Sequence, residues 1–406
     1  MNFDLSPEQR AIQQMVRQFA QEEVAPGAAE RDKTGVFPEA IFRDMAELSL
    51  LGLPYPEEVG GAGADTLSFA LVVEELARAC ASTALSYAAH ISLGCAPLYL
   101  FGTKEQQEKW LVPLCQGKFL GSFGLTEPNA GSDAGGTQTV ATLQEGQWVI
   151  NGCKCYITNA SYAGAVVATC RTEPKGGSNA ISAIIVPTGT EGYTIRNGYD
   201  KLGMRASNTC ELFFDDVKVP EENLLGERGK GFTQFLQVLD GGRISIAALA
   251  LGIAQACLDA SVKYANERVQ FGQSISKFQA ISFKLADMAT HIELARNQVH
   301  KAAWLKDEGR PFAKEAAMAK LFASEIATKA ALEAIQIHGG YGYIKEFPVE
   351  RYLRDAKLCE IGEGTSEIQR IVISRQLGCN ALSTEHKKAK KSSCLKCVDK
   401  AEKSAV

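Results

Sequence analysis

The runs WVING (148–152), AVVATC (165–170), AISAIIVP (180–187) and LFFDDVKVP (212–220) decide the fold class of this 406-residue chain. They are five to nine residues long and rich in the β-branched and aromatic side chains that favour strands. Turn residues separate them, since 15 of the 37 glycines fall within residues 121–228. We therefore predict an antiparallel β domain over residues 121–228.

Helical patterns flank this region on both sides. Residues 1–120 begin with Ser6-Pro7, a helix start, followed by apolar residues at helical spacing. After residue 229, a long segment alternates apolar spacings of three and four, which is typical of a helix packed in a bundle: Phe278, Ile281, Leu285, Met288, Ile292, Ala295 and Val299. The predicted order is a helical domain (1–120), a β domain (121–228) and a helical bundle (229–382), an α+β architecture.

Composition excludes several classes of function. The net charge of −4 leaves no basic field for nucleic acid. The longest stretch without Asp, Glu, Lys or Arg, residues 79–103, is interrupted by polar residues, so we expect a core helix and no membrane span. The start MNFDLSPEQR lacks the features of a signal peptide, so we expect the mature protein to begin at Met1. Twelve scattered cysteines indicate reduced thiols in a cytosol-like compartment.

The C-terminal residues 383–406 differ from the rest. Seven Lys stand against Glu385, Asp399 and Glu402, a net charge of +4. With almost no large apolar residues, this tail is predicted to be disordered, and a partner-binding arm is the alternative. Cys394 and Cys397 have the spacing of metal or redox ligands but no second pair, so we predict no metal site.

Residues 359–370, CEIGEGTSEIQR, place Glu360, Glu363 and Glu367 three and four residues apart. On one helix these carboxylates would share a face and repel one another. Gly362 and Gly364 flank Glu363, which predicts a break in the helix there. A new helix is expected to follow, with Ser366 and Gln369 at capping-box spacing. Glu363 itself is either a solvated loop residue or a functional carboxylate.

Two further stretches could contact a polar heterocycle. FGLTEPNAGSDAGG (123–136) joins a short strand to a loop in which backbone N–H groups, Thr126 and Ser132 could bind a phosphate or a ring edge. YITNAS (156–161) sets Tyr156 beside Thr158, which suits a flat ring stacked on one side. An ordinary turn and an ordinary strand end are the alternatives.

Taken together, these motifs resemble the flavin-dependent acyl-CoA dehydrogenase family. The resemblance rests on FGLTEPNAGSD, YITN, KLGMRAS with FFDDVKVPEENLLG, ERVQFGQSISKFQAIS, QIHGGYGY with RYLRDAK, and IGEGTSEIQR, in that order over about residues 3–378. It implies the acyl-CoA dehydrogenase fold: an N-terminal helical domain, a middle β domain and a C-terminal four-helix bundle.

The resemblance also implies a set of site residues. The implied FAD contacts are Phe123, Leu125, Thr126, Ser132, Tyr156, Ile157, Thr158, Arg268, Gln270, Phe271, Gln279, Gln336, Ile337, His338, Gly339, Gly340, Thr365 and Glu367. Residues 336–340 would meet FAD from a neighbouring subunit in a homotetramer. The implied acyl-CoA contacts are Ser132, Asp240, Gly241, Gly242, Arg243 and Gly364.

The implied reaction removes two hydrogens across the α and β carbons of an acyl-CoA, giving a trans-2-enoyl-CoA. Glu363 matches the family's base position, and Gly242 occupies the position that supplies the base in other branches. Electrons would pass to flavin N5 and then to an electron-transfer flavoprotein. The family implies a bacterial cytoplasmic location, or the mitochondrial matrix in a eukaryote.

Two alternatives stay open for the function, an oxidase that uses oxygen and a non-catalytic acyl-CoA-binding protein on the same fold. The acyl group is expected to be short, straight or branched. Tyr87 and His90, in the helix that would close the acyl pocket, are candidates to shorten it or, equally, core residues.

Overall fold

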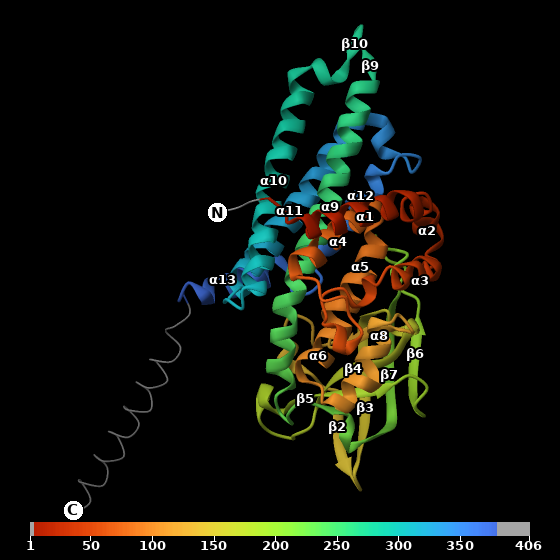
Figure 1. Ribbon diagram of the computed structural model, residues 1–406, viewed down its shortest axis with the longest axis vertical. Helices are drawn as coiled ribbons and strands as arrows, with labels where there is room; N and C mark the ends of the chain where they lie inside the picture. The colour runs from red at the N-terminus through yellow and green to blue at the C-terminus, as the bar shows by residue number, and fades with distance from the viewer. Residues whose placement is uncertain (1–3, 380–406) are drawn as a thin grey trace, which may run out of the picture.

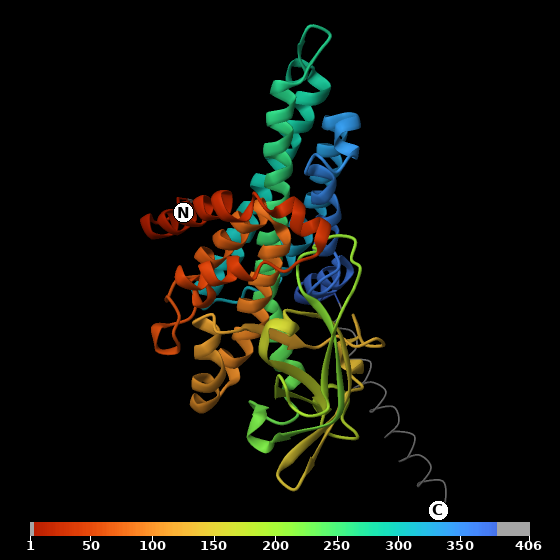
Figure 2. The same cartoon turned by 90° about the vertical axis from the view of Figure 1, so that its right-hand side faces the viewer.

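The structure, a computed structural model, describes residues 4–379 of the chain. A helical region, a β region and a second helical region follow one another, which confirms the predicted α+β fold. The molecule is elongated, with the sheet at one end and the β9–β10 turn at the other (Figures 1 and 2). The predictions for residues 383–406, including Cys394 and Cys397, lie outside the described residues.

The first helical region begins as predicted, because the Ser6 hydroxyl caps the first helix by accepting a bond from the Gln9 N–H at 3.1 Å. Three π-helical segments, Ala20–Val24, His90–Cys95 (η4) and Gln107–Leu111, interrupt its helices. The α-helices are α1 (Pro7–Phe19), α2 (Ala28–Thr34), α3 (Glu39–Glu47), α4 (Thr66–Ala79), α5 (Ala81–Ala89), α6 (Ala96–Phe101), α7 (Lys104–Gln106) and α8 (Val112–Cys115).

The middle region is a sheet with strand order β6-β7-β3-β2-β4-β5-β8, in which β1 also pairs with β4. Its strands are β1 (Leu120–Gly124), β2 (Val140–Gln144), β3 (Gln147–Thr158), β4 (Ala163–Arg171), β5 (Ile181–Pro187), β6 (Tyr193–Asn197), β7 (Thr209–Pro220) and β8 (Leu224–Leu225). The predicted antiparallel β domain is present, but two of its pairings differ from that prediction, since β1 and β2 both run parallel to β4. Two chain reversals separate β2 from β4, which restores the strand direction.

The second helical region is a bundle built on one long helix. Along it lie α9 (Gly231–Glu267), the short strands β9 (Val269–Gln270) and β10 (Gln273–Ser274), α10 (Gln279–Asp307), α11 (Ala313–His338), α12 (Val349–Cys359) and α13 (Ser366–Gln376). In the predicted seam of α10, Met288, Ile292, Ala295 and Val299 are buried. The apolar spacing therefore identified the core-facing side of this helix.

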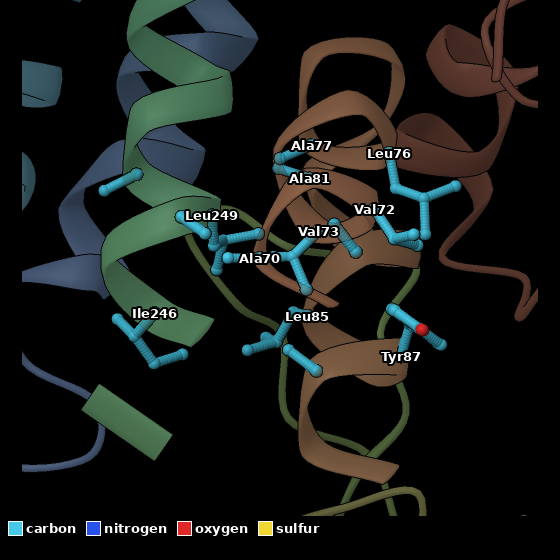
Figure 3. Close-up of a cluster of buried hydrophobic side chains, with 14 of the residues drawn as sticks. Ala70, Val72, Val73, Leu76, Ala77, Ala81, Leu85, Tyr87, Ile246 and Leu249 are labelled. Atoms are coloured by element: carbon cyan, nitrogen blue, oxygen red, sulfur yellow. The ribbon is translucent and has the colours of Figure 1, made fainter. Parts of the chain in front are cut away.

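The two helical regions share one hydrophobic core. Figure 3 shows Val73 and Leu85, from α4 and α5, facing Ile246 and Leu249 of α9. Gly252 of α9 permits this close approach, because a Cβ there would lie 2.3 Å from the Glu74 carbonyl oxygen. The N-terminal helices thus fix the position of α9, which carries part of the site described below.

The segment η4 joins the helices to the sheet. A Cβ on Gly94 would lie 2.3 Å from the Gly121 Cα, so only glycine fits between η4 and β1. The His90 Nδ1 accepts from the Gly121 N–H at 2.8 Å, and its Nε2 lies 2.8 Å from the Leu51 carbonyl. Burial lowers the pKa of His90 to about 4, so this ring is a neutral structural link.

Tyr87 and His90 are core residues. Both are fully buried, and the Tyr87 hydroxyl donates to the Leu50 carbonyl at 3.1 Å. The core alternative is therefore the one that the structure supports for these two side chains.

Two segments of the described chain are long and apolar enough to cross a membrane, Ala81–Phe101 and Gly231–Glu267. Their apolar windows are 67% and 78% buried inside the protein, as in core helices. The expected lack of a membrane span stays a prediction.

Candidate active site

Glu363 lies in a strained turn between two helices. α12 ends at Cys359, α13 begins at Ser366, and between them Glu363 and Gly364 have φ values of 51° and 94°. The left-handed conformation costs a non-glycine residue roughly 1 kcal/mol or more. The predicted helix break is therefore present, and surrounding contacts must hold it.

Those contacts come from α11 and α13. The Lys320 ammonium and the Gln369 amide donate to the Gly364 carbonyl at 2.7 and 2.8 Å. Thr365, and not Ser366 as predicted, caps α13 by accepting from the Ile368 N–H at 3.3 Å. The helix therefore begins at Ser366, one residue earlier than a Ser366 cap would give, because threonine is also a favourable N-cap residue.

Glu363 is half-buried, but its Oε2 atom is closed off from solvent and has no hydrogen-bond partner within residues 4–379. It points at α9, where a Cβ on Gly242 would lie 2.1 Å from Oε2. Leu93 of η4 lines the same spot, 3.7 Å from that Cβ position. Glycine at position 242 therefore makes room for the carboxylate.

Two buried cations surround this carboxylate. Arg243 of α9 is 3% exposed and pairs with Asp240, and Lys320 of α11 is fully buried. Burial raises the pKa of Glu363 to about 7, although Lys320 and Arg243 act in the opposite direction. Desolvation therefore outweighs the two positive charges.

The neighbouring glutamates differ from Glu363 in their surroundings. Glu360 accepts from the Thr328 hydroxyl and from the Lys357 ammonium, the latter at 2.8 Å. Glu367 is exposed, and its backbone and the Thr365 hydroxyl lower its pKa. Because of the helix break, Glu363 lies in a buried space, Glu360 is paired and Glu367 is exposed to solvent.

The expected flavin face lies at the ends of β1 and β3. The β3–β7 register shifts between Lys154 and Ile157, and Tyr156 there has φ 58° and is 66% exposed. Its ring stacks on Tyr199 with centroids 4.9 Å apart. A β-bulge thus turns an aromatic ring outward at a strand end, as bulges beside active sites do.

The other expected residues of this face occupy different positions. Phe123 is half-buried on β1 and stacks on Phe235 of α9, while Leu125 and Thr126 follow β1. Thr158 is half-buried and Ser132 is exposed. Ile157 packs in the core of the sheet, so its side chain cannot reach a ligand.

A buried ion pair that sequence reasoning missed anchors the loop after β1. The Lys154 ammonium donates to Glu127 at 2.7 Å, and Glu127 also accepts from the Gln138 and Thr139 N–H groups at 2.6 and 3.0 Å. This carboxylate spans the loop of 123–136 and holds its shape.

The remaining expected FAD contacts gather at the opposite end of the molecule, around β9 and β10 (Figure 1). A pocket of about 410 Å³ there brings together Arg268, Gln270, Ile337, His338, Gly339 and Gly340 with Tyr264, Ile275, Tyr341 and Ile344. Phe271, in the turn between β9 and β10, is 92% exposed. Gln279, at the start of α10, and Gln336, near the end of α11, are also exposed. Apart from Thr365 and Glu367 at the start of α13, the residues expected to contact FAD therefore lie in two separate places on one chain.

The residues present fit an FAD molecule. An outward-facing aromatic ring beside a threonine suits the flat ring system, and an arginine with glycine backbone N–H groups suits a pyrophosphate. No group of three metal-ligating side chains occurs within residues 4–379.

Sequence reasoning missed Lys320, a buried cation that binds the carbonyl of the residue after Glu363. It lies on the buried alanine stripe of α11, between Ala316 and Ala323. A lone charge within an apolar stripe was the available signal.

Three family models match the chain, those of the acyl-CoA dehydrogenase N-terminal domain (residues 6–118), middle domain (122–217) and C-terminal domain (229–378). Among curated proteins, the probable acyl-CoA dehydrogenase YngJ of Bacillus subtilis (strain 168) is 65% identical over 93% of this chain and 100% of its own length. The mitochondrial short-chain specific acyl-CoA dehydrogenase of Mus musculus is 48% identical, over 92% and 91%.

Solved structures agree with these matches. Butyryl-CoA dehydrogenase from Megasphaera elsdenii has a TM-score of 0.91 at 47% identity, covering 93% of this chain and 100% of its own. A chain from a study of the electron transferring flavoprotein of Acidaminococcus fermentans has a TM-score of 0.92 at 47% identity, covering 93% and 99%. PigA with FAD and proline has a TM-score of 0.90 at 30% identity, covering 93% and 99%.

The predicted enzyme class and the predicted FAD cofactor are confirmed by these relatives. On the fold, the three domain matches and the identities together, the chain belongs to the acyl-CoA dehydrogenase family of FAD-dependent oxidoreductases.

Proposed function

We propose that this enzyme converts a short-chain acyl-CoA to its trans-2-enoyl-CoA, with Glu363 as the base. The observation that carries the proposal is the Oε2 atom of Glu363, which is buried, has no partner within residues 4–379 and is directed into a space that Gly242 leaves open. Most buried carboxylates are paired, and an unpaired one in a strained turn points to a functional constraint.

The segment η4 contacts both the surroundings of this carboxylate and the strand β1 of the flavin face. Leu93 contacts the Gly242 position beside Glu363, and the next residue, Gly94, touches Gly121, two residues before Phe123. A ligand held at the end of β1 would therefore lie near Glu363.

The proton chemistry follows from this environment. With a pKa of about 7, a large fraction of Glu363 is ionised at neutral pH. The carboxylate is also basic enough to accept the α proton of the thioester. The Glu363 N–H has no acceptor among residues 4–379, so it is free to bind the thioester carbonyl as negative charge develops there. Such a donor contributes roughly 3 kcal/mol to a transition state.

Bound FAD supplies the acceptor for the hydride that leaves the β carbon. The residues that would hold it from this protomer are Phe123, Leu125, Thr126, Ser132, Tyr156, Thr158, Thr365, Glu367 and the backbone of Ile157. Asp240, Gly241, Gly242, Arg243 and Gly364 would hold the acyl-CoA.

The second group of FAD residues would act on a neighbouring protomer. The pocket at the β9–β10 end lies far from the flavin face of the same chain (Figure 1). Exposed apolar side chains along the bundle, including Phe283, Leu294 and Leu332, offer a surface for association. We therefore include a homotetramer in the proposal, and a measured mass in solution tests it.

The short acyl group and the electron acceptor rest on the relatives. The mouse relative is named short-chain specific, one solved neighbour is a butyryl-CoA dehydrogenase, and another comes from work on an electron transferring flavoprotein. We propose the same substrate range and acceptor here, in the bacterial cytoplasm or the mitochondrial matrix. Anaerobic flavin bleaching by acyl-CoAs of graded length tests the substrate range.

The variant Glu363→Gln tests the base assignment. It keeps the backbone N–H and nearly the same shape while removing the proton acceptor. We expect FAD and acyl-CoA binding to persist while the anaerobic rate of flavin reduction falls at least ~10²–10⁴-fold.

The matched control is Glu360→Gln, the neighbouring glutamate that already has partners. Its flavin reduction should stay within about tenfold of the unaltered enzyme. A Glu363→Gln enzyme that bleaches at the normal rate would refute the assignment.

A further inference from the structure

A buried ammonium beside the base has no assigned role. The Lys320 side chain is fully buried among the alanines of α11. Within residues 4–379 its ammonium donates one hydrogen bond, to the Gly364 carbonyl at 2.7 Å, so two of its three donors are left without an acceptor there. A buried lysine with one partner is costly, and structural packing alone would favour an apolar residue.

We propose that Lys320 is a positioning residue for the base, holding the 363–364 turn and supplying positive charge that favours the ionised Glu363. This inference rests on the proposed function of Glu363. Its geometry is direct, because the ammonium binds the carbonyl of the residue next to the base.

The mechanical part of this role is shared. The Gln369 amide donates to the same Gly364 carbonyl at 2.8 Å and lies 3.4 Å from the Glu363 carbonyl. Both side chains therefore stabilise a turn in which the φ of 51° at Glu363 is unfavourable for a non-glycine residue. Gln369 is also fully buried, but it carries no charge.

The electrostatic part belongs to Lys320 and Arg243. Arg243 on α9 is already paired with Asp240, which offsets much of its charge. Cys359 and Glu360, at the end of α12, also face Lys320, and Glu360 is paired with Lys357. Among the charged groups around Glu363, Lys320 is thus the cation without a carboxylate bound to it in the described chain.

The acid and base equilibria are consistent with this arrangement. Burial raises the pKa of Glu363 to about 7 and lowers that of Lys320 to about 8, and each group counteracts the shift of the other. Removing the ammonium should therefore raise the pKa of Glu363 further. Since the carboxylate form is the active one, the activity would then rise only at higher pH.

The experiment compares pH profiles of anaerobic flavin reduction at saturating butyryl-CoA. The variants are Lys320→Met, Lys320→Gln and, as the matched control, Gln369→Met. Both Lys320 variants should move the midpoint of the profile to higher pH by about 1 unit, since a nearby opposite charge shifts a carboxyl pKa by about 1–3 units. Lys320→Gln keeps a donor for Gly364 and should lose less of the limiting rate.

Gln369→Met loosens the same turn without changing charge, so its rate should fall while its midpoint stays within about 0.3 units of the unaltered enzyme. Lys320 variants with an unmoved midpoint would overturn the inference. So would failure of both to fold with FAD, which would assign Lys320 to folding alone.

Glu363→Gln is measured in the same series. If that variant bleaches normally, the proposed function fails; if it is inactive and the Lys320 midpoints do not move, only this inference fails.

Discussion

Replacing Gly242 by alanine should displace the base while leaving the fold intact. The added Cβ would lie 2.1 Å from Glu363 Oε2 and 3.2 Å from its carboxyl carbon. Ordinary van der Waals contact begins near 3.4 Å, so the carboxylate must retreat by about 1 Å. The atom displaced is the end of a flexible side chain, and the turn behind it is held by Lys320 and Gln369.

Gly242→Ala should lower the rate of flavin reduction but raise the stability of the helix. A misplacement of about 1 Å in a reacting group can cost ~10²-fold in rate. Alanine in a helix interior is about 1 kcal/mol more favourable than glycine. We therefore expect Gly242→Ala to keep FAD, melt no lower than the unaltered enzyme and reduce its flavin ~10²-fold more slowly.

The assay is anaerobic flavin bleaching at saturating substrate, with thermal unfolding measured in parallel. Gly241→Ala is the companion variant, because its Cβ would meet only the Lys306 ammonium, at 3.4 Å. Its limiting rate should stay within about threefold, even where substrate affinity changes. Normal bleaching by Gly242→Ala would refute the placement of the base against α9.

Three further outcomes are expected. First, Glu363→Gln should stabilise the protein at pH 8 by up to about 3 kcal/mol. The folded-state pKa of Glu363 is about 7 against an ordinary 4.5, so its ionisation destabilises the fold progressively between pH 4.5 and 7; equal melting temperatures of the two proteins at pH 8 would contradict this. Second, Arg268→Ala should weaken FAD retention and lower the mass in solution, because Arg268 lines the pocket at the β9–β10 end; gel filtration with flavin absorbance checks both. Third, deletion of residues 383–406 should leave turnover with a small electron acceptor intact, and loss of flavin on truncation would show that the tail is structural.

The sequence alone determined the layout and the position of the break. Strand runs, helical spacing and the glycines around Glu363 are local signals, and each produced its element because local propensity and burial agreed. The family resemblance rested on motifs whose order is a property of the sequence. The expected antiparallel pairing failed only at β4, with which both β1 and β2 pair in parallel, because strand direction there depends on which strands become neighbours in space.

Only the tertiary structure decided how the residues meet. Gly242 and Glu363 are 121 positions apart, and nothing local indicates that a glycine on one helix makes room for a carboxylate on a distant turn. Lys320 falls within the alanine stripe of α11, but only the packing of α11 against α9 shows that this stripe and its lysine are buried. The pKa of Glu363 likewise depended on whether burial or the surrounding cations prevailed, and that balance is set by three-dimensional packing because desolvation depends on every neighbour at once.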